Sequence, residues 1–444
     1  MRKLFIALSL GITPFSFAQT NPAITSWLQN TTQTGSYYNA GSSVTIGNGI
    51  LVNCQQVQYS TNWVYVSATG VPSYPTGPFT GDGNPSQAED QNAIFKIPLN
   101  PVQNTGTLTA TSGGNIGIFI NGVALFDYRD GVAWNNATSA LCGGPGNPPC
   151  PGGPTATMPW NRDAVLAEKP GFDCSKGHPA MGNYHHHQNP SAYNLDLNVI
   201  STICDLYAAD GLYAINPSEH SPLIGYAYDG FPIYGAYGYA NANGTGGIVR
   251  IKSGYQLRNI TTRTVWADGT DVADGPAVST TYPLGYFRED YEFVTHAGQE
   301  DYLDEHNGRF CITPEYPAGI YCYFATVDAN HNSAYPYAVG PTYYGVKTAG
   351  TVTSILEAVT TYTSTAGIDE TKKIDFKVFP NPSADIIMVQ TTGLTTNEIV
   401  IDLTDANGKV IQTQTIQKGS TIAYFDVATL YNGTYFVHIK SGAQ

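Results

Sequence analysis

The sequence predicts a mainly β protein, sandwich-like but irregular over most of its length, with a small β-sandwich at the C-terminal end. Charged residues make up 12% of the 444 residues, about half of the roughly 25% that is usual in soluble domains. Glycine (47 residues), tyrosine (31) and proline (28) are abundant instead. Glycine and proline favour turns and tyrosine favours strands, so this composition indicates short strands joined by many turns.

The first 18 residues are typical of a secretory signal peptide. Arg2 and Lys3 form a charged start, and residues 4–12 form an apolar segment that is too short to span a bilayer. Residues 16–18, Ser-Phe-Ala, supply small side chains for a cleavage site. No later run of about 18 apolar residues exists, so we expect no transmembrane segment.

The net charge excludes some classes of partner. Without Arg2 and Lys3, the 20 basic residues fall to 18 against 34 acidic residues, a net charge of −16. Nucleic acids and anionic lipid surfaces require a basic footprint, so we expect neither as a partner.

Most of the chain has the pattern of one β-rich domain. Residues 44–128 contain runs of β-branched and aromatic side chains separated by turns, and the region after 215 is again rich in Tyr, Gly and Pro. We expect this domain over 19–347, with its core at 44–345. A short helix is expected near 198–208, where apolar side chains recur at roughly helical spacing.

The composition changes after this domain. A Thr/Ser/Ala-rich stretch at 348–373 is expected to be a linker, although it could instead supply a last strand to the preceding domain. Residues 374–444 return to alternating strands, and Asn407-Gly408 between two of them is a good hairpin signal. This pattern predicts a separate small β-sandwich.

Three ordered motifs in this tail carry a resemblance: FPNPSAD at 379–385, DANGKV at 405–410 and LYNGTYFVHI at 430–439. The tail resembles the C-terminal sorting domain of the type IX secretion system of Bacteroidota. The resemblance implies an immunoglobulin-like β-sandwich, recognition by the type IX secretion machinery, and a secreted or outer-surface location.

Five segments carry a second resemblance. They are IGIFINGVALF (116–126), GHPAMGNYHHHQNP (177–190), HSPLIGYAYDGFPIYG (220–235), LDEHNGR (303–309) and TPEYPAGIYCYF (313–324). These segments resemble the YHYH domain family, with His186 at the place where the family's namesake motif has its second tyrosine. The resemblance implies no particular substrate or reaction.

Three consecutive histidines carry the main functional prediction. In an extended strand alternate side chains share a face, so His185 and His187 point one way and His186 points the other. Strand residues two apart are separated by about 7 Å, so their imidazoles can converge on one ion. His178 and His220 both lie in the matching segments and are the best candidates for further ligands.

Nitrogen ligands favour Zn or Cu over Ca and Mg, which prefer oxygen, so the expected cofactor is a transition metal ion, Cu or Zn. Asp229 and Tyr184 are the candidates for hydrogen bonds that orient the ligand histidines. Three alternatives stay open. The histidines could form a hydrogen-bonded Tyr/His core without metal, Asp229 could cap a turn, and His186 could be exposed or support a ligand.

The acidic segment EDYLDEHNGR at 300–309 has two interpretations. Its carboxylates could serve glycoside hydrolysis or calcium binding, or it could be a solvated loop around an Asn-Gly turn. The sequence lacks the motifs of α/β-hydrolases, zincins, P-loop proteins and dinucleotide-binding proteins. Whether the protein is an enzyme stays open.

Seven cysteines in an exported protein indicate disulfides. Their spacing suggests Cys142–Cys150 around a Gly/Pro loop, Cys311–Cys322 across a short hairpin and Cys174–Cys204 around the histidine run, with Cys54 left over.

Together these observations favour an exported metal-binding protein. If the bound metal ion keeps one coordination position open for water or substrate, the protein could be a metal-dependent enzyme. The alternative is a non-catalytic module with a structural Tyr/His core, which binds glycans or a protein through a tyrosine-rich face.

Overall fold

The computed structural model divides into an N-terminal unit, residues 1–363, and a C-terminal unit, residues 364–444, and each is described by itself. The structure describes residues 21–39, 42, 44–79, 86–144, 146–152, 158–190, 216–348, 350–363, 376–391, 399–405, 409–417 and 420–441. The predicted signal peptide (1–18) and the predicted helix (198–208) lie outside these residues. Within the described ranges, every helix is too short to cross a membrane.

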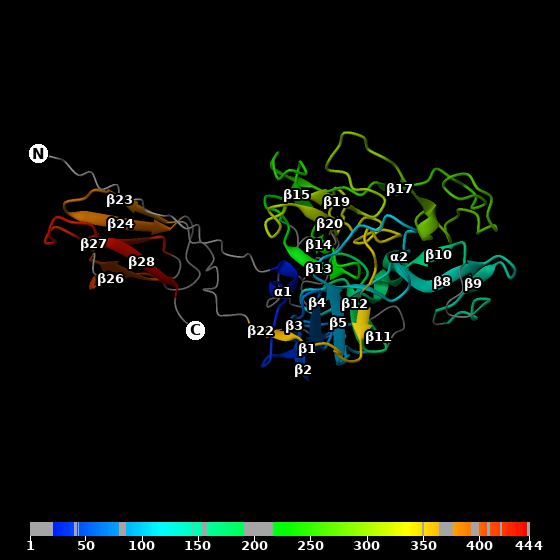
Figure 1. Cartoon of the computed structure of the whole chain (residues 1–444), viewed down its shortest axis with the longest axis horizontal. Helices are drawn as coiled ribbons and strands as arrows, with labels where there is room; N and C mark the ends of the chain where they lie inside the picture. The colour runs from blue at the N-terminus through cyan, green and yellow to red at the C-terminus, as the bar shows by residue number, and fades with distance from the viewer. Residues whose placement is uncertain are drawn as a thin grey trace, which may run out of the picture. The chain divides into compact units, whose positions relative to one another are not determined.

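An eight-stranded sheet forms the centre of the N-terminal unit and contains the strands around the histidine run (Figure 1). Its strands, in spatial order, are β11 (Gly177–Ala180), β12 (Asn183–His186), β7 (Ala124–Phe126), β6 (Asn115–Phe119), β13 (Leu223–Ala227), β14 (Pro232–Tyr234), β20 (Ile320–Phe324) and β19 (Gly308–Cys311). The pairs β12–β7 and β14–β20 are parallel, and the other neighbours are antiparallel. Parallel pairing requires long connections, so this sheet joins segments that are far apart in the sequence.

A five-stranded antiparallel sheet forms the second layer. In spatial order it contains β21 (Gly350–Val352), β5 (Ala93–Pro98), β4 (Trp63–Ala68), β3 (Cys54–Tyr59) and β22 (Thr360–Tyr362). Its two edge strands, β21 and β22, come from the segment that the sequence analysis expects to be a linker. They pair with β5 and β3, so residues 350–363 belong to the N-terminal unit. This is the alternative in which the stretch supplies strands to the preceding domain.

The two large sheets share one hydrophobic core. Val57 and Val66 of the five-stranded sheet are fully buried in it, together with Ile118, Tyr226 and Ile233 of the eight-stranded sheet. Each such side chain stabilises the fold by about 1.5–3 kcal/mol relative to its exposed state. The prediction of a mainly β, irregular sandwich is therefore confirmed.

Smaller elements surround this sandwich. They are β1 (Thr34–Tyr38) with β2 (Thr45–Leu51), β8 (Arg129–Asn135) between β9 (Ala140–Cys142) and β10 (Asn161–Asp163), β15 (Tyr237–Tyr239) with β16 (Ile248–Arg250), and β17 (Tyr255–Leu257) with β18 (Tyr291–Phe293). The described helices are α1 (Pro22–Thr25), α2 (Ala164–Glu168) and the 3₁₀ turns η2 (Lys169–Gly171) and η6 (Arg288–Asp290). Of these, α2 reaches the histidine run.

The C-terminal unit is a small β-sandwich, as predicted. One sheet has the order β23 (Phe376–Phe379), β24 (Ile386–Thr391), β27 (Ile422–Asp426), and the other has the order β26 (Val410–Ile416), β25 (Ile399–Thr404), β28 (Phe436–Ser441). Val389, Ile401, Leu403, Ile416 and Phe425 form its buried core. β25 and β26 are antiparallel neighbours on either side of the predicted Asn-Gly turn, which lies outside the described residues.

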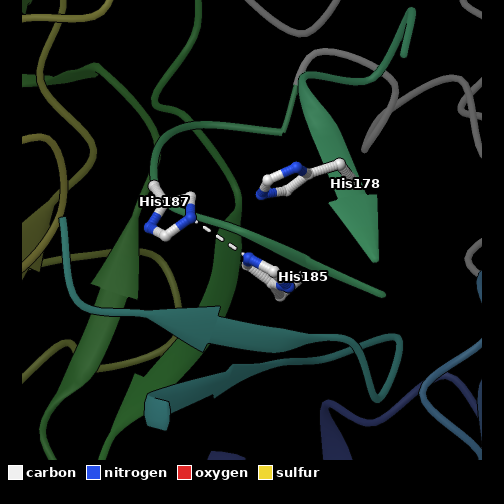
Figure 2. Close-up of side chains that lie close together, drawn as sticks. All are labelled: His178, His185 and His187. Atoms are coloured by element: carbon white, nitrogen blue, oxygen red, sulfur yellow. Dashed lines mark hydrogen bonds between the residues drawn. The ribbon is translucent and has the colours of Figure 1, made fainter. Parts of the chain in front are cut away.

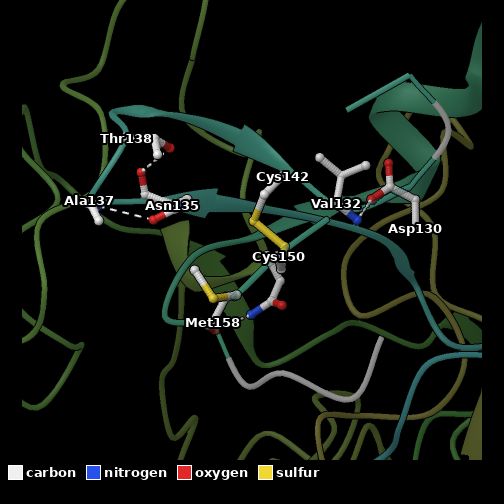
Figure 3. The surroundings of a disulfide bond; sticks show 9 residues. Asp130, Val132, Asn135, Ala137, Thr138, Cys142, Cys150 and Met158 are labelled. Carbon is white, nitrogen blue, oxygen red and sulfur yellow. Dashed lines mark hydrogen bonds between the residues drawn. A yellow bond between two sulfur atoms is a disulfide. The ribbon is translucent and has the colours of Figure 1, made fainter. Parts of the chain in front are cut away.

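Cys142 and Cys150 form the predicted disulfide, with their Cα atoms 4.8 Å apart (Figure 3). Cys142 ends β9, so the bond closes the Gly/Pro loop beside β8. Cys174 is also disulfide-bonded, and its predicted partner Cys204 lies outside the described residues.

The predicted Cys311–Cys322 disulfide is wrong, because both residues are free, buried thiols. The register of β19 and β20 places Cys311 opposite Ile320 and Cys322 opposite Arg309. The two cysteines are therefore diagonal neighbours across the strand pair, and their side chains interact as hydrogen-bonded thiols. Cys54, for which no disulfide partner was predicted, is also a free, buried thiol.

Candidate metal centre

A tight hairpin formed by β11 and β12 positions the histidine run. The strands pair up to a two-residue turn, Met181-Gly182. Both turn residues have positive φ (49° and 84°), as in a type I′ turn, whose twist matches that of antiparallel strands. The register that follows from this turn places His178 directly opposite His185.

Three histidines converge on one point between these elements (Figure 2). His178 lies on β11, His185 lies on β12, and His187 follows the end of β12. Their ligand nitrogens all lie within 4.8 Å of one another, and the three side chains are buried. Strand alternation thus places His185 and His187 on one face, and the hairpin adds His178 to them.

His186 points to the opposite face, as the alternation predicts, but it is fully buried rather than exposed. Its Nε2 lies 3.0 Å from the Tyr74 hydroxyl, and its ring packs edge-on against Tyr184. Burial lowers the pKa of His186 to about 3, so the ring is neutral. His186 therefore belongs to a Tyr/His core behind the three converging histidines.

Backbone carbonyls orient two of the converging imidazoles. Nδ1 of His185 donates to the Asn183 carbonyl at 2.8 Å, and Nδ1 of His187 donates to the Asp127 carbonyl at 2.6 Å. A neutral imidazole that donates from Nδ1 has an unprotonated Nε2. The Nε2 atoms of His185 and His187 are only 3.1 Å apart, so two lone pairs face each other in the neutral tautomers. A cation between them, either a proton on one Nε2 or a metal ion, removes this repulsion.

On His185 a proton is disfavoured. Burial lowers the pKa of His185 well below its usual value, and the charges of His187 and His178 lower it further. A metal ion binds the lone pairs directly and requires neutral imidazoles, the form that burial favours at His185. The donor set therefore fits a metal ion.

Glu168 is a fourth group at the cluster, which the sequence analysis does not identify. It ends α2, a helix capped by Asp163, whose carboxylate accepts from Val165 N at 2.8 Å. Oε2 of Glu168 lies 3.2 Å from Nε2 of His178 and 3.1 Å from Nε2 of His187. Its side chain is 22% exposed, whereas those two histidines are 5% and 3% exposed. Glu168 therefore forms the solvent side of the cluster.

The Glu168 carboxyl is ionised. Burial raises its pKa, but hydrogen bonding and charge attraction from His178 and His187, when these imidazoles carry a proton on Nε2, outweigh burial and hold the pKa well below its usual range. The resulting negative charge adds to the attraction for a cation. No signal in the local sequence AVLAEKPG marks this residue, because its approach to the hairpin is a long-range contact of a short helix.

Two phenylalanines form apolar walls around the imidazoles. Phe126 stacks on His185 with ring centroids 3.7 Å apart, and Phe172 packs edge-on against His178 at 5.0 Å. These rings fix the orientation of the ligands and keep the local dielectric low, which strengthens charge interactions within the site.

The structure does not bring His220 to this cluster, which among the described residues comprises His178, His185 and His187. Nδ1 of His220 donates to the Ser221 carbonyl at 2.7 Å, and its ring lies near two tyrosine rings. The reason is the order of the sheet. His220 precedes β13, and β6 and β7 separate β13 from β12.

Asp229 orients a tyrosine rather than a ligand histidine. It lies in the turn after β13 and accepts from the Tyr323 hydroxyl at 2.5 Å and from the Gly345 N–H at 2.8 Å. Burial raises the pKa of Asp229 to about 6. Asp229 also accepts from the Phe231 N–H at 3.3 Å, which is the turn-capping contact of the alternative interpretation.

Tyr184 also turns away from the cluster. Its hydroxyl donates to Asp173 at 2.8 Å, on the side of the hairpin where His186 lies. The carbonyls of Asn183 and Asp127 take the orienting role expected of Tyr184 and Asp229. Backbone carbonyls are common second partners of ligand histidines, but a sequence does not show where they point.

The acidic segment at 300–309 is structural. Asp301 pairs with Lys252 at 2.6 Å, and Asp304 accepts from the Tyr321 hydroxyl at 2.8 Å. The Glu300 carboxylate accepts from the Ala242 N–H at 2.6 Å. Each of these carboxylates has a protein partner.

Comparison with known families covers most of the N-terminal unit. The YHYH protein family matches residues 94–335, more than half of the chain. The chain belongs to the YHYH protein family. The matched region of this YHYH protein contains Glu168 and the three converging histidines.

The tail of this YHYH protein matches the secretion system C-terminal sorting domain over residues 377–444. This match points to type IX secretion, to an interaction with its machinery, and to a secreted or cell-surface location. No curated protein and no solved structure matches the chain.

Proposed function

We propose that this YHYH protein is an exported metal-binding protein, which holds one transition metal ion at His178, His185 and His187. The observation that carries the proposal is the approach of two Nε2 atoms to 3.1 Å while both Nδ1 atoms donate to carbonyls. Neutral imidazoles in this arrangement repel each other unless a cation lies between them.

The donor atoms support a particular class of metal. Three imidazole nitrogens suit Zn²⁺ or Cu²⁺, whereas Ca²⁺ and Mg²⁺ prefer sets made only of oxygen. The carbonyl partners of His185 and His187 hold both rings with Nε2 toward the site, which lowers the entropic cost of binding. The site is therefore largely preformed.

The burial of five tyrosines of the core argues against their use in a tyrosine-rich binding face, which is the alternative. Tyr184, Tyr226, Tyr234, Tyr323 and Tyr343 are all fully buried in the core of the N-terminal unit. Their ring faces pack against protein and are closed to a glycan. We therefore place the function in the metal cluster.

Metal content of the purified full chain tests the proposal. After incubation with Zn²⁺ or Cu²⁺ and desalting, elemental analysis is expected to find one metal ion per chain. His185→Ala/His187→Ala is expected to lose it, and the matched control His220→Ala, in the same unit, is expected to keep it. The proposal fails if the unaltered chain retains neither metal, or if the double variant retains as much as the control.

A further inference from the structure

We propose that Glu168 is the fourth metal ligand, so that the site is a closed tetrahedral set of three imidazole nitrogens and one carboxylate oxygen. This inference rests on the proposed function, and it decides whether the metal keeps a position for a substrate. The distances between donor atoms carry it.

A tetrahedral site has a characteristic spacing between ligands. With bonds of about 2.0–2.1 Å, neighbouring donor atoms lie roughly 3.3–3.4 Å apart. Three of the donor–donor distances are close to this value. Glu168 lies 3.2 Å from His178 and 3.1 Å from His187, and His187 lies 3.1 Å from His185. The two remaining pairs of histidine nitrogens lie within 4.8 Å and need to approach by at most about 1.5 Å. Glu168 is not part of the group whose ligand atoms all lie that close, so its oxygen has to approach His185 as the site closes around the ion.

The same distances argue against a role for Glu168 as a general base outside the coordination sphere. Such a carboxylate would accept from a metal-bound water, and the water oxygen would then occupy the fourth corner of the tetrahedron. The carboxylate oxygen would lie one hydrogen bond further out, about 4–5 Å or more from the imidazole nitrogens. Oε2 of Glu168 lies closer than that, at 3.1–3.2 Å from two of the imidazole nitrogens.

Glu168 is held in place by a supported helix. Asp163 both caps α2 and accepts from the Tyr337 hydroxyl at 2.7 Å. β10, which leads directly into α2, pairs with β8. The carboxylate therefore comes from a fixed element on one side, and the histidines come from the hairpin on the other. A metal ion bound to both would link α2 to the β11–β12 hairpin.

A closed site has consequences for the kind of metal and the kind of function. Four protein ligands leave the metal ion no open coordination position. Structural and storage sites have this arrangement, whereas hydrolytic sites keep one position for water. A tetrahedral set with one carboxylate suits Zn²⁺ or Co²⁺ better than Cu²⁺, which prefers tetragonal geometry. We therefore infer that the protein retains a tetrahedral divalent ion and does not activate a metal-bound water.

Cobalt substitution of the full chain tests this inference, because four-coordinate Co²⁺ absorbs visible light far more strongly than five- or six-coordinate Co²⁺. The unaltered chain and the control Glu305→Gln, which changes an exposed carboxylate, are expected to bind one Co²⁺ with the intense four-coordinate spectrum. Glu168→Gln is nearly isosteric, so the fold is expected to persist. Glu168→Ala is expected to admit water, to lose most of that intensity, and to bind Co²⁺ at least about tenfold more weakly.

Two failures are distinguishable. If the unaltered chain binds no Co²⁺ or Zn²⁺, the metal centre itself is wrong, and this inference falls with it. If the chain binds Co²⁺ but both Glu168 variants keep its spectrum and affinity, the histidine centre stands and Glu168 is not a ligand. A five- or six-coordinate spectrum in the unaltered chain would likewise overturn the closed site, because it requires bound water.

Discussion

The turn of the β11–β12 hairpin allows a quantitative test of how the backbone builds the metal centre. Gly182 has a φ of 84°, a conformation that costs an alanine about 1–2 kcal/mol. A Cβ at this position would lie 2.7 Å from Oε2 and 2.9 Å from Cβ of Glu89. The Glu89 backbone cannot retreat freely, because its N–H donates to the Gly182 carbonyl at 2.8 Å, a bond worth about 1 kcal/mol. Gly182→Ala is therefore expected to cost about 2–3 kcal/mol.

Urea unfolding followed by tryptophan fluorescence measures this cost. All five tryptophans lie in residues 1–363, so the signal reports the N-terminal unit. Gly298→Ala is the matched control for backbone strain, since Gly298 has a φ of 76° but no atom within 4 Å of an added Cβ. Gly47→Ala adds neither strain nor contact and is expected to change stability by less than about 0.5 kcal/mol.

The turn also sets the register that places His178 opposite His185. Gly182→Ala is therefore expected to weaken Zn²⁺ binding about tenfold, an effect of the size seen when groups that orient metal ligands are lost. The reasoning is refuted if Gly182→Ala destabilises no more than Gly298→Ala, or if it binds Zn²⁺ with unchanged affinity.

Removing bound metal with a chelator is expected to lower the thermal midpoint of the N-terminal unit, and Zn²⁺ at 100 times its Kd is expected to restore about 2.7 kcal/mol; equal midpoints with and without Zn²⁺ would contradict the proposed centre. Tyr337→Phe removes the hydroxyl that donates to the buried Asp163, so it is expected to cost about 1–3 kcal/mol in urea unfolding. Tyr431→Phe, in the exposed tail, is the control, and a similar effect of both would sink this explanation. Burial raises the pKa of Asp229 from 3.8 to about 6, so its contribution to stability is full below about pH 4 and is lost as the pH rises through about 6. Stability of the unaltered protein is therefore expected to fall by up to about 3 kcal/mol more than that of Asp229→Asn between about pH 4 and pH 8, and parallel pH curves would show that the carboxyl is not buried in its neutral form.

Local patterns were enough to predict part of the metal centre. The pairing of His185 with His187, and the opposite orientation of His186, follow from the two-residue period of a strand. That period is a property of the backbone and holds wherever the strand lies. The hairpin that adds His178 turns at Met181-Gly182, a turn that was not predicted from the sequence.

Long-range placement accounts for the predictions that were wrong. His220 and Asp229 lie in a segment resembling the family, yet β6 and β7 separate that segment from the cluster. Cys311 and Cys322 flank a hairpin, as expected, but the register makes them diagonal neighbours. Both sheet order and register depend on which side chains pack together across the whole core, and one-residue differences in pairing change every contact.

The sequence by itself determined the mainly β class, the separate sorting tail and the histidine pair on one strand face. These features rest on composition, on motifs and on the backbone period, all of which act over a few residues. Only the tertiary structure decided that His178 joins the histidine pair and that Glu168 lies beside them. It also decided that His220 lies elsewhere, and that carbonyls of Asn183 and Asp127 orient the imidazoles. Those contacts join α2, β7 and the hairpin, and they exist only because the packed core fixes these elements relative to one another.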